Sequence, residues 1–337
     1  MGRRITPPRS STAFATVDFD RAGKQVGFVM IPHSPHDDAW GATRVPVAVI
    51  KNGEGPTVVL EGGNHGDEYE GPVSLLKAAG SLDPAKITGR VIILPCLNFP
   101  AVQAGTRTSP IDKGNMNRSF PGRADGSVTE KIADYVRRHL LPLAVCVLDI
   151  HSGGKTLEFL PFAACHRRTD KELEARTIAA MKSFGAPYGM LMIELDSVGM
   201  LDTSAEEMGK VFVSTELGGG GTLTARTLAI AERGLRNVLI HAGILAGEIP
   251  PAASRMLDMA DGDCFVIGAE RGLVEPCVDL GESVEAGQVV VRIHDFEHTG
   301  RPAIEYRAKR AGLLAGRHFP GRAQPGDCLA VIATPLT

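Results

Sequence analysis

The chain has 337 residues, enough for a complete core and two domains, and its formal net charge at pH 7 is −3. This near balance of charge gives no polybasic face for nucleic acid or an anionic membrane, and no apolar run is long enough to span a bilayer. The six cysteines form no C-x-x-C pair and several lie in apolar, strand-like runs, which favours free thiols and a cytoplasmic location over a disulfide framework.

The predicted elements begin with a basic, proline-bearing segment, residues 1–16, that we expect to be flexible. Two β-rich runs, 27–31 and 42–51, predict antiparallel strands that lead into the fold. Strands and helices then alternate, which favours a mostly parallel sheet flanked by helices, an α/β fold. The expected strands are 57–61, 90–95, 144–150, 210–216 and one near 237–241, and the expected helices lie near 70–80, 129–141, 170–184 and 222–234.

A linker is predicted near 246–256, where prolines and small residues replace the alternating pattern. Beyond it, two half-repeats each begin with Gly-Leu and continue through a glycine turn into a strand. They predict a small β-barrel or sandwich domain over residues 256–337 that resembles lipoyl-type barrels. Its one lysine, Lys309, lacks the neighbours expected for modification, so we expect this domain to shape the pocket or a dimer contact. The remainder, 17–247, is the predicted catalytic domain.

The first candidate site is the glycine-rich turn between the strand 57–61 and the helix 70–80. Its His65 and Glu68 stand three residues apart, so one turn of backbone can direct both side chains at one point. Imidazole plus carboxylate suits zinc. The pattern H-x-x-E is common by itself, however, and a capped helix start with solvated acids explains it equally well. The other ligands have to come from elsewhere in the chain.

His151 ends the apolar strand 144–150, directly before Ser-Gly-Gly. Sites in parallel α/β sheets form at the carboxyl ends of strands, which makes His151 a candidate third ligand. Asp149 lies two residues earlier on the same strand face, where it can hold the other nitrogen of a metal-bound imidazole. The alternatives are a core histidine bonded to the backbone and an aspartate bonded to a helix terminus.

Glu216 ends the strand 210–216, before Leu217 and four glycines. A carboxylate near an activated water can take its proton and return it to a leaving amine, although a strand-end acid facing solvent is the commoner case.

The polar loop 104–122 contributes Arg107 and Arg118. Arginine binds carboxylates bidentately and stabilises oxyanions, but loop arginines are more often simply solvated.

Three ligand-type residues, a spare carboxylate and an arginine loop thus each follow a separate predicted strand. Three protein ligands with an open fourth position are typical of catalytic zinc. The segments that carry this pattern resemble the four signature segments of the succinylglutamate desuccinylase/aspartoacylase family, whose members are amidohydrolases on the zinc-carboxypeptidase fold. The four segments are Gly63–Glu68, Asn117–Gly122, Asp149–His151 and Thr215–Gly218.

The resemblance extends over nearly the whole chain and implies one Zn²⁺ per chain and a defined set of site residues. The implied roles are zinc binding by His65, Glu68 and His151, general base and acid catalysis by Glu216, polarisation of the scissile carbonyl by Arg107, and binding of the substrate α-carboxylate by Asn117 and Arg118.

Within the family, the sequence is most similar to members that deacetylate Nα-acetyl-L-2,4-diaminobutyrate in ectoine degradation. The similar segments include Asp38–Gly41, Gly105–Asp112 and Ile150–Thr156. Such a pocket must accept a cationic side chain, for which Glu194 and Asp196 are candidates, unless both are surface acids.

These observations predict a zinc-dependent amidohydrolase that deacylates a small N-acyl amino acid and forms a homo-oligomer, with a dimer as the first guess. Three alternatives stay open. They are a family member with another acyl substrate, a zinc carboxypeptidase that cleaves peptides, and a non-catalytic module that binds a partner through the arginine loop and the C-terminal barrel.

Overall fold

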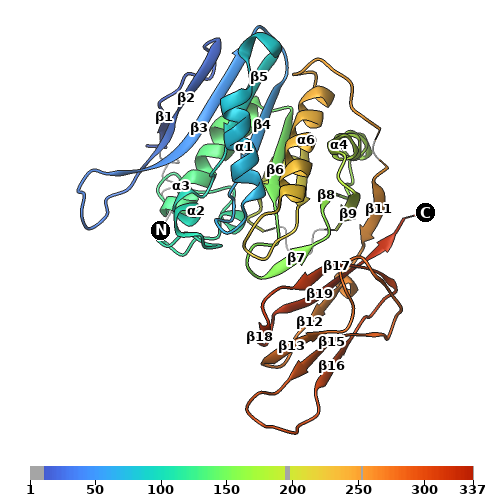
Figure 1. Cartoon of the computed structure of the whole chain (residues 1–337). Helices are drawn as coiled ribbons and strands as arrows, with labels where there is room; N and C mark the ends of the chain where they lie inside the picture. Colours follow the sequence, from blue (N-terminus) through green and yellow to red (C-terminus); the bar gives the residue numbers. More distant parts are fainter. Residues whose placement is uncertain (1–10, 194–197, 252, 337) are drawn as a thin grey trace, which may run out of the picture.

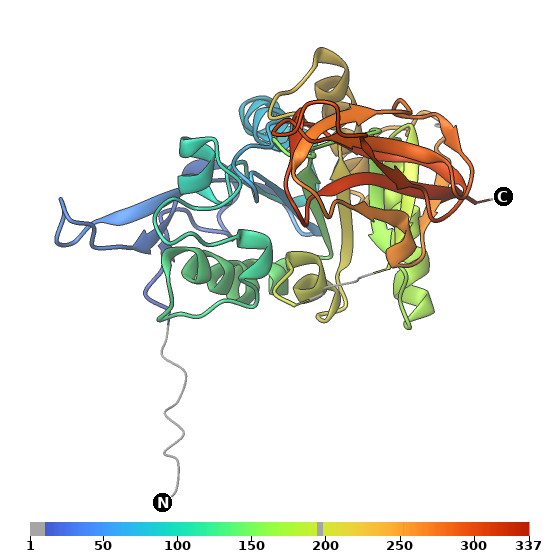
Figure 2. The same cartoon turned by 90° about the horizontal axis from the view of Figure 1, so that it is seen from below.

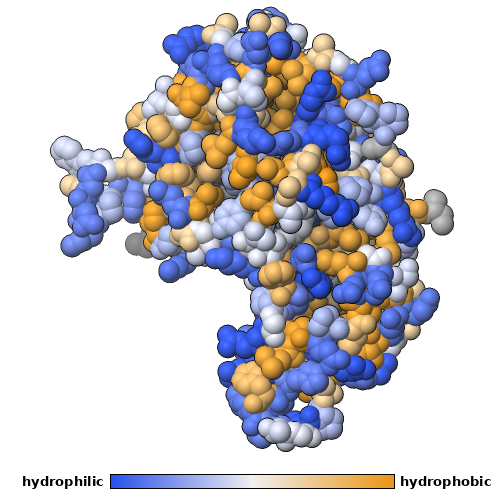
Figure 3. All heavy atoms as spheres, in the orientation of Figure 1, coloured by the Kyte–Doolittle hydropathy of each residue, from blue (hydrophilic) through white to orange (hydrophobic). Residues whose placement is uncertain are grey.

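The structure, a computed structural model, describes residues 11–193, 198–251 and 253–336. These residues form an N-terminal lobe, in which helices cover both faces of a central sheet, and a C-terminal lobe built mainly of strands (Figure 1). Seen from below, the C-terminal lobe lies at the side of the sheet away from the N-terminal strands (Figure 2). In the space-filling view it is a narrower mass joined to the larger lobe (Figure 3).

The central sheet is mixed, with parallel strands in its middle. In spatial order its strands in this lobe are β1 (Phe14–Ala15), β2 (Gly23–Pro32), β3 (Ala42–Asn52), β5 (Gly89–Leu94), β4 (Thr57–Gly62), β6 (Cys146–His151), β10 (Val211–Glu216), β8 (Phe162–His166), β9 (Tyr188–Met192) and β11 (Arg255–Met259). Parallel pairs join β5, β4, β6 and β10, and also β8, β9 and β11. Strand β8 lies antiparallel to β10, and the first three strands are antiparallel.

Each face of the sheet has its own apolar core. Helices α1 (Glu70–Ser81), α4 (Lys171–Phe184) and α6 (Ala225–His241) pack on one face, and α2 (Phe99–Ala104), α3 (Val128–Tyr135) and α5 (Leu201–Glu206) pack on the other. Because side chains alternate along a strand, Leu148 and Ile150 of β6 belong to the first core and Val147 to the second. Asp149 and His151 therefore point toward the face of α2, α3 and α5.

The segment 1–16, expected to be flexible, ends in a short strand, because Phe14–Ala15 form β1, which pairs with Val29 and Met30 of β2. Residues 1–10 of this segment lie outside the described residues. One sequence prediction is wrong. The strand expected near 237–241 is the last part of α6. Its run Val-Leu-Ile suits a buried strand, yet no helix-breaking residue separates it from the preceding helix, and the buried positions continue at helical spacing through Leu235, Val238 and Leu239.

The C-terminal lobe continues the central sheet. Strand β11 pairs with β9 on one side and with β19 (Cys328–Pro335) on the other, and β7 (Leu157–Phe159) of the N-terminal lobe pairs with β17 (Gly312–His318). A four-stranded sheet, ordered β16-β15-β13-β18, packs against this extension over an apolar core that includes Val290, Ile293 and Leu329. The strands are β12 (Phe265–Ile267), β13 (Gly272–Pro276), β14 (Ser283–Val284), β15 (Val289–His294), β16 (Ile304–Arg307), β17 (Gly312–His318), β18 (Arg322–Ala323) and β19 (Cys328–Pro335).

The predicted α/β architecture, a sheet flanked by helices, is therefore present, although β1, β2 and β3 pair antiparallel and β8 lies antiparallel to β10. The domain limits 17–247 and 256–337, the lipoyl-like character of the second domain and the zinc-carboxypeptidase likeness stay predictions.

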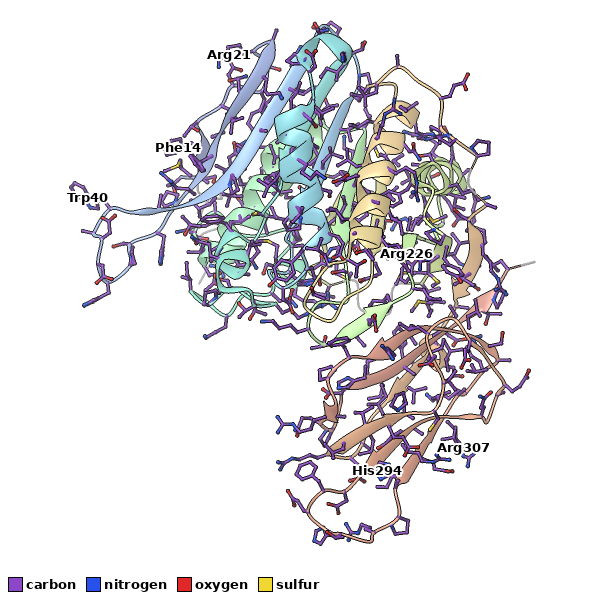
Figure 4. The ribbon with its side chains drawn as sticks, in the orientation of Figure 1. Phe14, Arg21, Trp40, Arg226, His294 and Arg307 are labelled. Carbon is purple, nitrogen blue, oxygen red and sulfur yellow. The ribbon has the colours of Figure 1, made fainter. Side chains whose placement is uncertain are left out.

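The hairpin of β2 and β3 projects from the N-terminal lobe and carries Trp40 at its end, with 97% of its surface exposed (Figure 4). All six cysteines are free. Among the helices of the described ranges, none has the length and apolarity needed to cross a bilayer.

Candidate active site

The candidate site forms where three parallel strands end together. In the register of the sheet, His151 at the end of β6 lies directly beside Glu216 at the end of β10, and Ile150 lies beside Gly62 at the end of β4. The turn that follows β4 carries His65 and Glu68 and leads into α1. The apolar strands thus fix three separate segments of the chain at one edge of the sheet.

His65, Glu68 and His151 converge on one point. Glu68 lies between the two rings, with Oε1 2.7 Å from His65 Nδ1 and Oε2 2.9 Å from His151 Nδ1. One ligand atom from each of the three residues lies within 4.8 Å of the others, and all three side chains are buried. This group of two imidazoles and one carboxylate could hold a metal ion.

The outward-facing nitrogen of each imidazole has a partner that fixes the ring. Asp149 Oδ2 lies 2.8 Å from His151 Nε2 and also accepts a hydrogen bond of 3.0 Å from the Asn64 side-chain amide. Asn115 Oδ1 lies 3.3 Å from His65 Nε2. The Nδ1 atoms are therefore left for a metal, which is the usual arrangement of a metal-binding histidine held by an oxygen acceptor. The structure thus places Asp149 behind the His151 ring, and its role in metal binding stays a prediction.

The charges around Glu68 favour its ionised form. Burial opposes ionisation, but the two histidines beside Glu68 hold its pKa well below the usual range. Burial also acts against the charged form of His151, yet the carboxylates of Asp149 and Glu68 raise its pKa well above 6.5. For His65, burial prevails over the attraction of Glu68, and its pKa is lowered. The centre is thus an anionic ligand between two imidazoles, which suits a divalent cation.

Glu216 has the opposite electrostatic character. Burial, followed by the charge of Glu68, raises the pKa of Glu216 to about 8. Its Oε2 atom is buried and has no hydrogen-bond partner among the residues that the structure describes. A carboxyl group with a pKa near neutrality, an oxygen that no described residue hydrogen-bonds and a position beside His151 can both accept and donate a proton.

A cavity of about 200 Å³ opens onto this centre. Its walls come from the loop 104–122, from β8, β10 and the end of β9, and from α5. Arg107 lies at the edge of the metal group, with Nη1 3.4 Å from Glu68 Oε1. The lining residues are His65, Arg107, Asn117, Arg118, His151, Phe162, Ala164, Cys165, His166, Met192, Met200, Asp202, Phe212, Ser214 and Glu216.

The loop 104–122, which carries Arg107 and Arg118, is hydrogen-bonded to α5 and lines the cavity. Asn117 Oδ1 accepts a hydrogen bond of 2.9 Å from the Leu201 backbone N–H at the start of α5. This bond directs the NH₂ group of Asn117 away from the helix. Arg118 lines the cavity and donates to the Asn117 carbonyl at 2.6 Å.

The structure therefore brings the metal group, Glu216, Arg107, Asn117 and Arg118 together at one cavity. Several residues that line the cavity or hold the metal group were not anticipated, among them Asn115 and Asp202. Asn115 caps a 3₁₀ turn in an irregular loop, and Asp202 lies on the short helix α5, so neither ends a strand or follows a period that could single it out. Glu194 and Asp196, the expected acidic wall, lie outside the described residues.

Comparison with known proteins now decides the family. The sequence model of the succinylglutamate desuccinylase/aspartoacylase catalytic domain matches residues 54–242. The chain belongs to this family. Every residue of the metal group and Glu216 lies within the matched segment, so the site described above is part of the family's catalytic domain.

Relatives of this family member match it along its whole length. The N-alpha-acetyl-L-2,4-diaminobutyric acid deacetylase of Halomonas elongata is 51% identical over 335 residues, which cover 99% of this chain and 98% of that protein. The product-bound structure of the ectoine utilization protein EutE (DoeB) from Ruegeria pomeroyi is 55% identical, with a TM-score of 0.95, and covers 97% of this chain and 100% of its own.

A crystal structure of a succinylglutamate desuccinylase from Silicibacter sp. TM1040 is 53% identical, with a TM-score of 0.94 and the same coverage of both chains. The prediction of an amide-hydrolysing enzyme of this family is thereby confirmed.

Proposed function

We propose that the protein hydrolyses Nα-acetyl-L-2,4-diaminobutyrate to acetate and L-2,4-diaminobutyrate. The observation that supports this proposal is a buried His65–Glu68–His151 group beside Glu216 in a chain that is 51% identical, over 99% of its length, to a deacetylase named for that substrate. The cavity of about 200 Å³ also suits a small acylated amino acid. It lies below the roughly 300–1,000 Å³ typical of ligand pockets, which disfavours a carboxypeptidase that takes peptides.

The resident metal in this proposal is zinc. Two imidazole nitrogens and one carboxylate are a common ligand set of catalytic zinc, and the partners on the outer nitrogens leave both Nδ1 atoms directed at Glu68. When bound, the ion supplies a Lewis acid that polarises the acetyl carbonyl and acidifies water. Measurement of the metal content of the purified protein tests this assignment, with about one equivalent of zinc expected.

Glu216 is the proton-transfer group of the proposal. Its Oε2 takes a proton from the attacking water and returns it to the α-nitrogen, so that the leaving group departs as an amine. This atom accepts no hydrogen bond from the described part of the chain, which supports the role, because a carboxylate held by other hydrogen bonds is a weaker base. Arg107, next to Glu68, stabilises the negative charge that grows on the acetyl oxygen.

Asn117 and Arg118 bind the α-carboxylate of the substrate in this proposal. The Asn117 carbonyl oxygen is occupied by the Leu201 N–H, so its NH₂ group can donate to a carboxylate. Arg118 adds a charged donor on the wall of the same cavity. Together they orient the acetamide toward the metal group.

The deciding experiment compares acetate release from Nα-acetyl-L-2,4-diaminobutyrate with hydrolysis of Nα-acetylaspartate and succinylglutamate by the zinc-loaded protein. We expect turnover of the first substrate to exceed that of the other two. Removal of the metal with a chelator should abolish the activity, and added zinc should restore it. Absence of acetate release from the first substrate would contradict the proposal, and cleavage of short peptides instead would favour the carboxypeptidase alternative.

Two companion proposals concern the whole protein. The six free cysteines are consistent with the cytoplasmic location that we propose for a catabolic deacetylase. The homodimer stays a prediction, which light scattering of the purified protein tests.

A further inference from the structure

We propose that Asp202 binds the side-chain ammonium group of the substrate and so sets the enzyme's preference for a cationic amino acid. This inference rests on the proposed deacetylase function. It assigns the acidic wall of the pocket to α5, a part of the chain that the sequence did not indicate.

Asp202 is a buried acid on the wall of the catalytic cavity. It is 6% exposed, and it lines the cavity together with His65, His151 and Glu216. Among the described residues that line the cavity, the only carboxylates are Asp202 and Glu216. Since Glu216 serves proton transfer, Asp202 is the carboxylate that remains to recognise a positive charge.

Asp202 and Glu206 lie one helical turn apart on α5 but have different ion-pair environments. Glu206 is fully engaged, because Arg168 donates to it at 2.5 Å and His166 Nδ1 lies 3.3 Å away. Asp202 Oδ1 accepts the Thr203 N–H, whereas its Oδ2 has an imidazole nitrogen of His166 at 3.9 Å, beyond hydrogen-bond distance. The imidazole of His166 is thus the cationic partner that faces Asp202 among the described residues, at the outer limit of an ion pair. An ammonium ligand in the cavity can approach Asp202 Oδ2 more closely and stabilise the buried carboxylate.

The backbone before Asp202 is fixed to the proposed carboxylate-binding residues. Leu201 donates its N–H to Asn117, and Phe120 donates its N–H to the Gly199 carbonyl at 3.0 Å. Gly199 has a positive φ of 82°, and a β-carbon there would lie 2.5 Å from the Arg118 carbonyl oxygen. The Asn117–Arg118 segment and Asp202 therefore belong to one packed unit. This unit can bind the α-carboxylate and the side-chain ammonium group at a fixed separation.

As a consequence, Asp202 selects substrates by the charge of their side chain. A substrate with a side-chain carboxylate, such as Nα-acetylaspartate, would place a negative charge near Asp202 and be rejected. Nα-acetyl-L-norvaline has a methyl group where the diaminobutyrate derivative has its ammonium group, so it fits the same space without the charge. A site built to bind a charged donor should disfavour such an analogue by about 1,000-fold or more in kcat/KM.

The test is the ratio of kcat/KM for Nα-acetyl-L-2,4-diaminobutyrate to that for Nα-acetyl-L-norvaline. Asp202→Asn keeps the size of the side chain and an acceptor for the Thr203 N–H but removes the charge. We expect this substitution to lower the ratio by about 100-fold, through the charged substrate alone. Glu206→Gln is the matched control, because it removes a buried acid from the same helix that does not line the cavity, and its ratio should equal that of the wild type.

An unchanged ratio in the folded Asp202→Asn variant would overturn the inference while leaving the proposed function intact. Wild-type protein that releases no acetate from the diaminobutyrate derivative would instead refute the proposed function. Folding of each variant is checked by circular dichroism and zinc content. If Asp202→Asn does not fold, Asp202→Ser replaces it in the same comparison, with the same two outcomes.

Discussion

Replacement of Glu216 by glutamine tests the proposed transfer of a proton from the attacking water to Glu216 Oε2. Glutamine has the size of glutamate but cannot take a proton at the atom that is Oε2 in the wild type, which is buried without a hydrogen-bond partner among the described residues. Loss of a positioned general base lowers a rate by roughly 10²–10⁴-fold, or about 3–5 kcal/mol of activation barrier. We expect kcat to fall by this amount. The metal content should not change, because His65, Glu68 and His151 are untouched.

The same substitution should stabilise the metal-free protein. Burial and the charge of Glu68 raise the pKa of Glu216 to about 8, above its usual value of 4.5, so the folded state disfavours the carboxylate. The stability associated with the protonated form is fully present below pH 4.5 and is lost as the pH rises toward 8. Glutamine is neutral throughout. At pH 7 we therefore expect the metal-free variant to exceed the wild type in unfolding free energy by on the order of 1–3 kcal/mol, and the difference should vanish near pH 4.

Both effects are measurable on one preparation. Acetate release under saturating substrate gives kcat, elemental analysis gives the zinc content, and thermal unfolding in the presence of a chelator gives the stability at each pH. Glu216→Asp, which keeps the carboxylate but withdraws it from the cavity, should have an intermediate kcat. A Glu216→Gln variant that binds zinc and keeps kcat within about tenfold of the wild type would refute the assignment of the base.

Three further substitutions test other parts of the site. Asp149→Asn removes the carboxylate behind His151 and should weaken zinc binding by about 10–100-fold in a competition with a chelator; unchanged affinity would contradict the role of Asp149. Arg118→Ala should raise the activation free energy calculated from kcat/KM by about 2–5 kcal/mol, mainly through KM, and a loss confined to kcat would argue against carboxylate binding. Burial of Asp112 opposes its ionisation, but hydrogen bonds from Thr129 and neighbouring groups hold its pKa at about 2, so Asp112→Ala should cost about 1 kcal/mol of stability at pH 7. The wild type should lose this contribution as the pH falls from about 4 to 2, and equal melting temperatures of the two proteins at pH 7 would refute it.

The sequence predicts the central strands well because their apolar runs are bounded by turns. The expected strands 57–61, 144–150 and 210–216 differ from β4, β6 and β10 only at their ends. The prediction fails at 237–241, where a β-branched, apolar run fits a buried strand and a buried helix face equally well. Only the packing of α6 on the sheet decides between the two.

The residues of the candidate site also divide into those that the sequence indicates and those that it does not. Polar residues that interrupt or end an apolar strand, such as His151 and Glu216, stand out in the sequence because an isolated polar group there needs a reason. Asn115 and Asp202 give no such signal. Their positions depend on an irregular loop and on a six-residue helix, and the place of that helix is set by contact between Gly199 and Arg118. Side chains brought to a cavity by tertiary packing alone have no local pattern from which they could be predicted.

The pairing of β11 with both β9 and β19 has a consequence for any attempt to shorten the enzyme. A fragment that stops at the predicted linker would lack β11, and β9 would become the last strand of the sheet, with the buried Met190 and an unpaired backbone open to solvent. Strand β7 would lose β17 in the same way. Strands with exposed, unpaired edges pair with edge strands of other molecules. We therefore expect the N-terminal lobe alone to be recovered as aggregates.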